Sequence, residues 1–189
     1  MIPGTTHYPA ELDHQYTRIH VGVSWPASRS GYAVVVGQSR DRAIRGEYVL
    51  DVLDEVVEGR LYALVAMLAG LHHYFRPERI LADTEHVAAM QFATTLGLGI
   101  EPALLCAMHQ PLAYALPLVA RALEVDRIVL PAGSRLRGEL LTTPAHVDPA
   151  TLKPADYPGV TALAYAALSL DSQRTQGPRQ VTAKTSRRI

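Results

Sequence analysis

The segment 20–37 constrains the fold of this chain more than any other. It reads HVGVSWPASRSGYAVVVG, which is two apolar runs joined by a polar turn that contains Pro26 and Gly31. The second run, 32–36, consists of Tyr, Ala and three Val, and aromatic and β-branched residues favour strands. The pattern predicts two short strands connected by a tight turn.

The rest of the chain alternates strand-like and helix-like patterns. A third strand is expected over 43–52, where it completes an antiparallel meander with the first two. Further strands are expected at 79–83 and 100–106, helices at 58–74, 86–96, 111–123, 134–141 and 159–170, and a short extended piece at 128–130. This order predicts an α/β domain with a mixed five-stranded sheet, in which the meander is joined by two parallel strands and helices cover both faces.

Composition predicts one domain with two unlike termini. The chain has 189 residues, of which 48% are hydrophobic, enough for a sizeable core. Five of its 18 basic residues and none of its 18 acidic residues lie from Arg174 onward, so the remainder has 13 basic and 18 acidic residues. We expect an N-terminal extension over 1–17, a domain over 18–172 and a basic, flexible tail over 173–189.

Several classes of protein are disfavoured by the sequence. No segment has the unbroken apolar length that spans a bilayer, and the first residues lack the pattern of a signal peptide. The single cysteine, Cys106, lies in an apolar run and excludes a disulfide within the chain. These observations predict a cytoplasmic protein that does not contact membranes.

Several motifs resemble the nuclease domain of phage large terminase subunits, the DNA-packaging enzymes. The resemblance covers 18–170 and rests on VGVSWPA at 21–27, GYAVVV at 31–36, ILAD at 80–83, IVLP at 128–131, LRGEL at 136–140 and TALAYA at 161–166. It implies a ribonuclease H-like fold. The loop of the companion packaging ATPase, Gly-x-x-x-x-Gly-Lys-Ser/Thr, does not occur in the sequence.

The chemistry of this family implies a cluster of carboxylates that holds two divalent ions, Mg²⁺ or Mn²⁺, on the scissile phosphate. The carboxylates come from the first strand, the end of the fourth strand and the start of the last helix. Asp83 matches the second position, whereas Ser24 stands at the first. At the third, Tyr157 and Pro158 occupy the acidic positions and Asp156 lies one residue early.

These departures predict a degenerate site and a non-catalytic role, with no metal cofactor. The alternative is an active Mg²⁺- or Mn²⁺-dependent endonuclease, of terminase or resolvase type, whose rearranged site uses Asp83, Glu85 and Asp156. Glu85 also has a simpler interpretation, because an acidic residue near a helix start is stabilised by the helix dipole.

The predicted partners are DNA or proteins of a phage packaging or assembly machine. The predicted location is the host cell cytoplasm, or association with the virion if the chain is encoded by a phage. The candidate DNA-binding residues are the basic residues around the first turns and in the tail, namely Arg29, Arg40, Arg42, Arg174, Arg179, Lys184, Arg187 and Arg188. Interspersed acidic residues make a mixed solvated surface an equal alternative for the arginines of the first turns.

Overall fold

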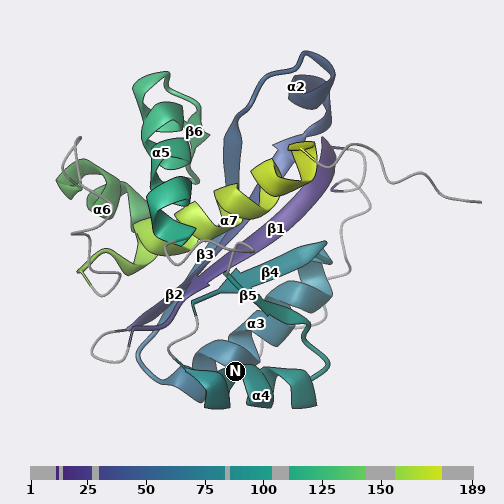
Figure 1. The fold of residues 1–189 in the computed structure, drawn as a ribbon, viewed down its shortest axis with the longest axis vertical. Coiled ribbons are helices and arrows are strands. Elements are labelled where there is room, and N and C mark those ends of the chain that lie inside the picture. Colours follow the sequence, from purple (N-terminus) through teal and green to yellow (C-terminus); the bar gives the residue numbers. More distant parts are fainter. Residues whose placement is uncertain are drawn as a thin grey trace, which may run out of the picture.

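The computed structural model describes residue 12 and residues 15–26, 30–83, 86–103, 111–143 and 156–175. In this part of the chain six strands form one sheet, in the order β5-β4-β1-β2-β3-β6 (Figure 1). The strands are β1 Tyr16–Ser24, β2 Gly31–Ser39, β3 Leu50–Glu58, β4 Arg79–Ala82, β5 Ile100–Pro102 and β6 Ile128–Val129. β1, β2 and β3 form the antiparallel meander, while β4 and β5 run parallel to β1, and β6 runs parallel to β3.

Helices cover both faces of this sheet (Figure 1). They are α2 Arg40–Ile44, α3 Leu61–Phe75, α4 Val87–Thr95, α5 Pro111–Glu124, α6 Leu136–Thr142 and α7 Pro158–Thr175. α3 and α4 pack on one face, and α5, α6 and α7 pack on the other. No helix of the described residues is both long and apolar enough to cross a membrane.

The period of two along the strands divides the core into two clusters. On β2, Val34 and Val36 pack with α5, α6 and α7, whereas Ala33 and Val35 pack with α3 and α4. All four side chains are fully buried. Because successive side chains point to opposite faces, a strand buried on both sides needs a continuous apolar run, which is what 32–36 supplies.

α7 lies against β1 at a glycine. A Cβ atom added to Gly22 would stand 1.9 Å from the carbonyl oxygen of Ala162 and 2.6 Å from the amide nitrogen of Ala166. Only a residue without a side chain allows the helix to approach the strand this closely. This contact sets the distance between α7 and the sheet. It therefore also positions the first turn of α7, which is one part of the predicted site.

The α/β class, the mixed sheet and the helices on both faces are confirmed, and three details are corrected. The sheet has six strands instead of five, because Ile128 and Val129 pair with Leu50 and Asp51. The strand expected over 43–52 is wrong in its bounds, since 40–44 forms α2 and β3 covers 50–58. The strand expected over 100–106 ends at Pro102 among the described residues.

The misplaced third strand has a physical cause. The segment 53–58 reads LDEVVE, and acidic residues are depleted in strands, so it looked unlike one. In the folded chain, Leu53 and Val56 pack against the α3 and α4 cluster, which stabilises the strand by tertiary contact.

Candidate functional site

Ser24 and Asp83 lie side by side at the carboxyl ends of two parallel neighbouring strands. The register of β1 and β4 pairs His20 with Arg79 and continues to Val23 with Ala82, so Ser24 and Asp83 follow as the next pair. The amide of Asp83 donates to the carbonyl oxygen of Val23 at 3.3 Å, which continues the ladder by one step. Two of the three predicted positions therefore meet at one edge of the sheet.

Asp83 is a buried carboxylate that holds the chain after β1. Its Oδ2 accepts a hydrogen bond from the backbone amide of Trp25 at 3.0 Å. Its backbone carbonyl accepts a second one from the Trp25 indole Nε1 at 3.2 Å. Asp83 is 7% exposed and Trp25 is 1% exposed. These two hydrogen bonds tie Asp83 to the segment that directly follows β1.

Ser24 contributes a buried hydroxyl to this site. It alternates with His20 and Gly22 on the face of β1 that packs against α7, since His20 contacts Ser169 and Gly22 abuts Ala162. Ser24 is fully buried, and among the described residues its Oγ has no hydrogen-bond partner. The hydroxyl of Thr161, on the first turns of α7, is in the same condition. The described part of the site thus combines the neutral hydroxyl of Ser24 with the carboxylate of Asp83.

Asp156 and Pro158 lie where α7 begins. Asp156 is exposed in the turn before the helix, and Pro158 is the first helical residue, a position that tolerates proline because its missing amide is not needed there. Burial thus distinguishes Asp156, which faces solvent, from Asp83, which does not.

The start of α7 is held by an acidic residue that the sequence analysis missed. Oε2 of Glu139, on α6, accepts hydrogen bonds from the amides of Gly159 at 2.7 Å and Val160 at 3.1 Å. A carboxylate at a helix N-terminus pairs with unsatisfied amides and with the positive end of the helix dipole. Glu139 stands inside the LRGEL motif, but sequence alone gave it no role.

A second missed carboxylate, Glu55 of β3, holds the start of α6. It accepts hydrogen bonds from the hydroxyl of Tyr32 at 2.9 Å, the hydroxyl of Ser134 at 3.0 Å and the amide of Leu136 at 3.3 Å. Burial, and then the hydrogen bond to Glu55, raise the pKa of Tyr32 far above its usual value. Tyr32 therefore stays a neutral donor, and Glu55 serves the structure of the α6 and α7 region.

Among the described residues, the oxygen donors at this edge do not form a cluster of carboxylates. Across the ranges that the structure describes, no three His, Cys, Asp or Glu side chains come together as a metal site would require. Mg²⁺ and Mn²⁺ prefer carboxylate and carbonyl oxygens, and the neutral hydroxyl of Ser24 is a poor substitute. Glu85 lies outside the described residues.

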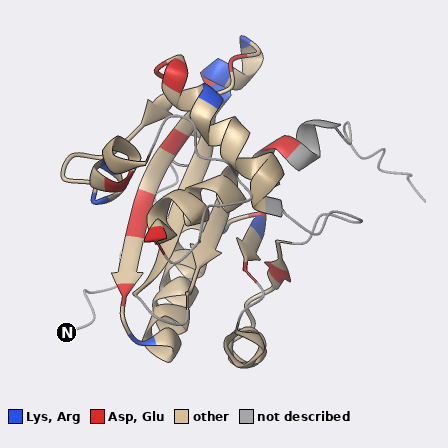
Figure 2. Cartoon of the chain, turned by 60° about the vertical axis from the view of Figure 1, so that its left-hand side comes forward, with Lys and Arg blue, Asp and Glu red and all other residues tan. Residues whose placement is uncertain are grey.

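The predicted DNA-binding residues fall into two groups. Arg40 and Arg42 lie on α2, where Figure 2 shows basic residues gathered at one end of the molecule. Nη1 of Arg42 lies 3.0 Å from Oδ1 of Asp51, so an ion pair takes up part of its charge. Arg174 is in the last turn of α7, but its side chain is not described. The remaining predicted residues lie outside the described part of the chain, namely Arg29, Arg179, Lys184, Arg187 and Arg188.

Comparison with known proteins finds solved structures with a similar fold. No protein-family model and no curated protein sequence matches this chain. The nuclease domain of the large terminase (g2p) of bacteriophage SPP1, solved with bound Mn, is similar at a TM-score of 0.59 and 18% identity, covering 86% of this chain and 91% of that domain. The large terminase nuclease of thermophilic phage G20c, solved with bound zinc, is similar at a TM-score of 0.53 and 16% identity, covering 81% and 83%.

This chain corresponds to less than half of a longer terminase of known structure. The large terminase of a further thermophilic bacteriophage is similar at a TM-score of 0.59 and 12% identity, and the match covers 84% of this chain but 43% of that protein. The mixed sheet, the helices on its two faces and these likenesses together confirm the predicted ribonuclease H-like architecture. The chain therefore has the fold of phage large terminase nuclease domains, and the resemblance seen in its motifs is confirmed at the level of fold.

Proposed function

We propose that this chain is a terminase-nuclease-like domain that binds DNA within a phage or prophage packaging machine and does not cleave it. The observation that carries the proposal is Ser24, a buried neutral hydroxyl next to Asp83 at the carboxyl ends of β1 and β4. By the resemblance, this is where the family places its first metal-binding carboxylate.

Charge supports a non-catalytic role. Two divalent ions about 4 Å apart repel each other and need several carboxylates to hold them. The described part of this edge supplies the carboxylate of Asp83, and one of its oxygens already accepts the Trp25 amide. Glu139 and Glu55, two acidic side chains of the α6 and α7 region, already accept hydrogen bonds from the amides that begin these helices. A second dication would therefore be held by too little negative charge.

The charge distribution supports DNA as the partner. The five basic residues from Arg174 onward follow a body in which acidic residues outnumber basic ones. A cationic segment of this kind gains affinity for nucleic acid by releasing counterions from the phosphate backbone. The structural neighbours are nuclease domains or whole large terminases of phages, so we place the protein with such a machine in the host cytoplasm.

Plasmid nicking tests the absence of catalysis. The full chain is incubated with supercoiled plasmid and Mn²⁺, beside Asp83→Asn and Asp83→Ala variants, whose folding is checked by circular dichroism. We expect no nicking above the buffer control from any of the three proteins. Nicking by the unmodified chain that disappears in both variants would overturn the proposal and support the rearranged site of Asp83, Glu85 and Asp156.

A mobility-shift assay tests DNA binding. The full chain and a chain that ends at Thr175 are compared on the same duplex over a range of salt concentrations. We expect a salt-sensitive shift from the full chain that is strongly weakened by the truncation. If the full chain gives no shift, DNA is not the partner, and a protein of the packaging machine takes its place.

A further inference from the structure

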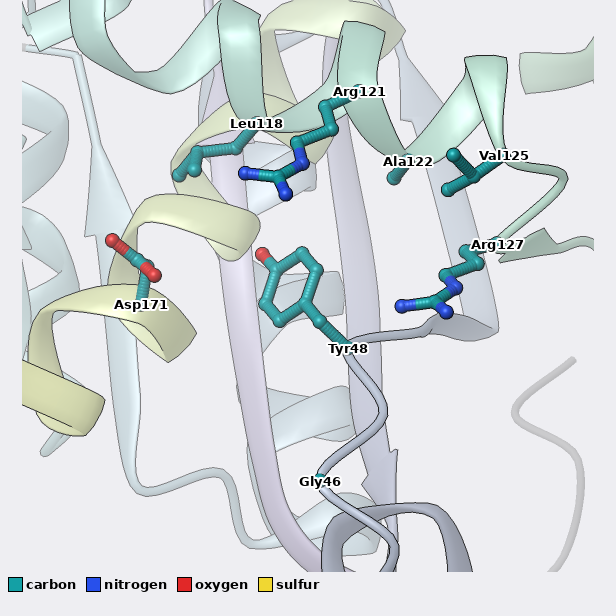
Figure 3. Close-up of a pocket in the computed structure, with 8 residues that line it drawn as sticks. All are labelled: Gly46, Tyr48, Leu118, Arg121, Ala122, Val125, Arg127 and Asp171. Carbon is teal, nitrogen blue, oxygen red and sulfur yellow. The ribbon is translucent and has the colours of Figure 1, made fainter.

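A pocket with two arginines lies at the other end of the molecule from Ser24 and Asp83. It has a volume of about 260 Å³ and is lined by Tyr48, Leu118, Arg121, Val125, Arg127 and Asp171, among others (Figure 3). Asp171 is 13 residues beyond Pro158 on α7, which corresponds to roughly 20 Å along a helix. The pocket is therefore separate from the edge of the sheet described above.

Arg121 and Arg127 supply positive charge to the pocket. Figure 3 shows the guanidinium groups of Arg121 and Arg127 directed toward the ring of Tyr48, from α5 and from the segment that leads to β6. Within the part of the chain that the structure describes, neither group forms an ion pair with an acidic side chain. Guanidinium groups bind phosphate with paired hydrogen bonds, so two of them lining one pocket favour a phosphate group.

Asp171 places a negative charge at the other end of the pocket from Arg127. Its Oδ2 accepts a hydrogen bond from the hydroxyl of Tyr114 at 3.2 Å, and it lies across Tyr48 from Arg127 in Figure 3. A carboxylate repels a phosphate but accepts hydrogen bonds from hydroxyl or amino groups. The pocket is thus suited to a molecule that has an anion at one end and hydrogen-bond donors at the other.

The remaining wall is apolar and held in place. The hydroxyl of Tyr48 donates to the carbonyl oxygen of Ala167 at 3.3 Å, which anchors the ring against α7. Leu118 and Val125 add aliphatic surface from α5 and the residue after it. A flat ring beside aliphatic groups suits the carbon face of a small sugar.

We propose that this pocket binds a small phosphorylated polyol of the sugar-phosphate class. The phosphate lies against Arg121 and Arg127, and the hydroxyl groups donate to Asp171. Ligand pockets commonly measure about 300 to 1,000 Å³, and a volume near the lower limit fits a sugar phosphate better than a dinucleotide. The carboxylate of Asp171 also disfavours a DNA strand, which would bring further phosphates to that side.

Isothermal titration calorimetry of the full chain with ribose 5-phosphate tests the proposal. We expect Arg121→Gln and Arg127→Gln each to weaken binding at least about tenfold, because each removes charge-assisted hydrogen bonds. Arg137→Gln is the matched control, since Arg137 is an exposed arginine on α6 outside the pocket, and it should leave the affinity unchanged.

Inorganic phosphate, as a second ligand, distinguishes the contribution of the two arginines from that of Asp171. We expect inorganic phosphate to bind more weakly than ribose 5-phosphate and to depend on the same two arginines. Asp171→Ala should weaken the binding of ribose 5-phosphate, whose sugar hydroxyl groups lose their acceptor. It should not weaken the binding of inorganic phosphate, which has no sugar hydroxyl groups and which the carboxylate repels. Circular dichroism of each variant confirms that it folds.

Three outcomes would overturn this assignment. One is the absence of binding heat at about 10 mM ribose 5-phosphate, a concentration at which a ligand with a Kd of about 1 mM is mostly bound. Another is binding that neither arginine substitution changes. The third is loss of duplex DNA binding in the arginine variants without any binding of ribose 5-phosphate, which would make these residues part of a DNA surface.

Discussion

At the residue scale, two residues of β1 that face α7, Gly22 and His20, have opposite requirements for space. Gly22 has no side chain, and the backbone of α7 fills the space where one would lie. His20 is a fully buried imidazole whose Nδ1 lies 2.6 Å from the hydroxyl oxygen of Ser169. The strand and the helix pack closely here, so position 22 has no space for a side chain and the imidazole of His20 fits only with its contact to Ser169.

Substitution of Gly22 by alanine should destabilise the protein strongly. The added methyl would meet the Ala162 carbonyl oxygen at 1.9 Å, and because backbone must move to relieve this contact we expect a loss of about 3 kcal/mol or more in the free energy of unfolding. Urea denaturation followed by circular dichroism measures the loss. Gly70→Ala is the control: a Cβ there meets nothing within 4 Å, and it should stabilise α3 by about 0.5–1 kcal/mol. Equal stability of the Gly22→Ala variant and the unmodified chain would refute this packing.

Acid should destabilise the fold through His20. Burial lowers the pKa of His20 to about 3, with smaller contributions from the charges of Arg79 and Arg18, while Glu101 acts in the opposite direction. Nε2 lies 3.8 Å from Oε2 of Glu78, too far for a hydrogen bond. The unfolded chain, in which the pKa is 6.5, binds the proton more readily than the folded chain. Stability from this residue is therefore fully present above about pH 6.5 and falls by about 1.4 kcal/mol per pH unit as the pH drops toward 3.

Unfolding free energies measured across this range will show the dependence. We expect His20→Gln to reduce the slope by about 1.4 kcal/mol per pH unit, because an amide does not titrate. His73→Gln, at an exposed position of α3, is the matched control and should keep the slope of the unmodified chain. Identical slopes in the His20→Gln variant and the unmodified chain would show that another group is responsible.

At the element scale, helix α7 depends on a chain of carboxylates. Glu55 of β3 holds the start of α6, and Glu139 of α6 holds the start of α7. Sequence periodicity predicted both helices to within a few residues, and the structure places them at Leu136–Thr142 and Pro158–Thr175. Their caps were not predicted, because each comes from a residue that lies about 20 or more positions away along the chain.

Removal of the Glu139 carboxylate should loosen the start of α7. We expect Glu139→Ala to lower the free energy of unfolding by about 1–2 kcal/mol, since two buried amides lose their acceptor. Glu139→Gln should lose less, because its amide oxygen still accepts a hydrogen bond. Chemical denaturation checks both, with the exposed Glu124→Ala on α5 as a control that should change stability by no more than about 0.5 kcal/mol. A Glu139→Ala loss as small as that of the control would argue against the cap.

At the scale of the whole molecule, the distribution of charge separates a mildly acidic body from a basic C-terminal segment. Four basic residues, namely Arg179, Lys184, Arg187 and Arg188, follow the end of α7 at Thr175. On the body, Arg42 is compensated by Asp51, and Arg79 pairs with Glu101, which raises the pKa of Arg79 and lowers that of Glu101. We therefore attribute most of the proposed DNA affinity to the segment after α7.

The salt dependence of DNA binding should show how many of these four basic residues contact phosphate groups. Each phosphate contact contributes about −0.9 to the slope of log Kobs against log salt concentration, so four contacts give a slope of roughly −3 to −4. Fluorescence anisotropy with a labelled duplex measures this slope for the full chain. Truncation after Thr175 should bring the slope close to zero, whereas an unchanged slope would place the contacts on the folded body.

Residue types and their spacing were enough to predict the β-hairpin at the start of the sheet, the α/β class, most helices and the absence of a carboxylate at position 24. These follow from residue type and local periodicity, which act over a few neighbours along the chain. The sixth strand, the bounds of β3, the caps made by Glu139 and Glu55, and the pocket of Arg121 and Arg127 became visible only in the folded chain. Each of these depends on contacts between residues far apart in the chain, and such contacts exist only after the sheet has brought its strands and helices together.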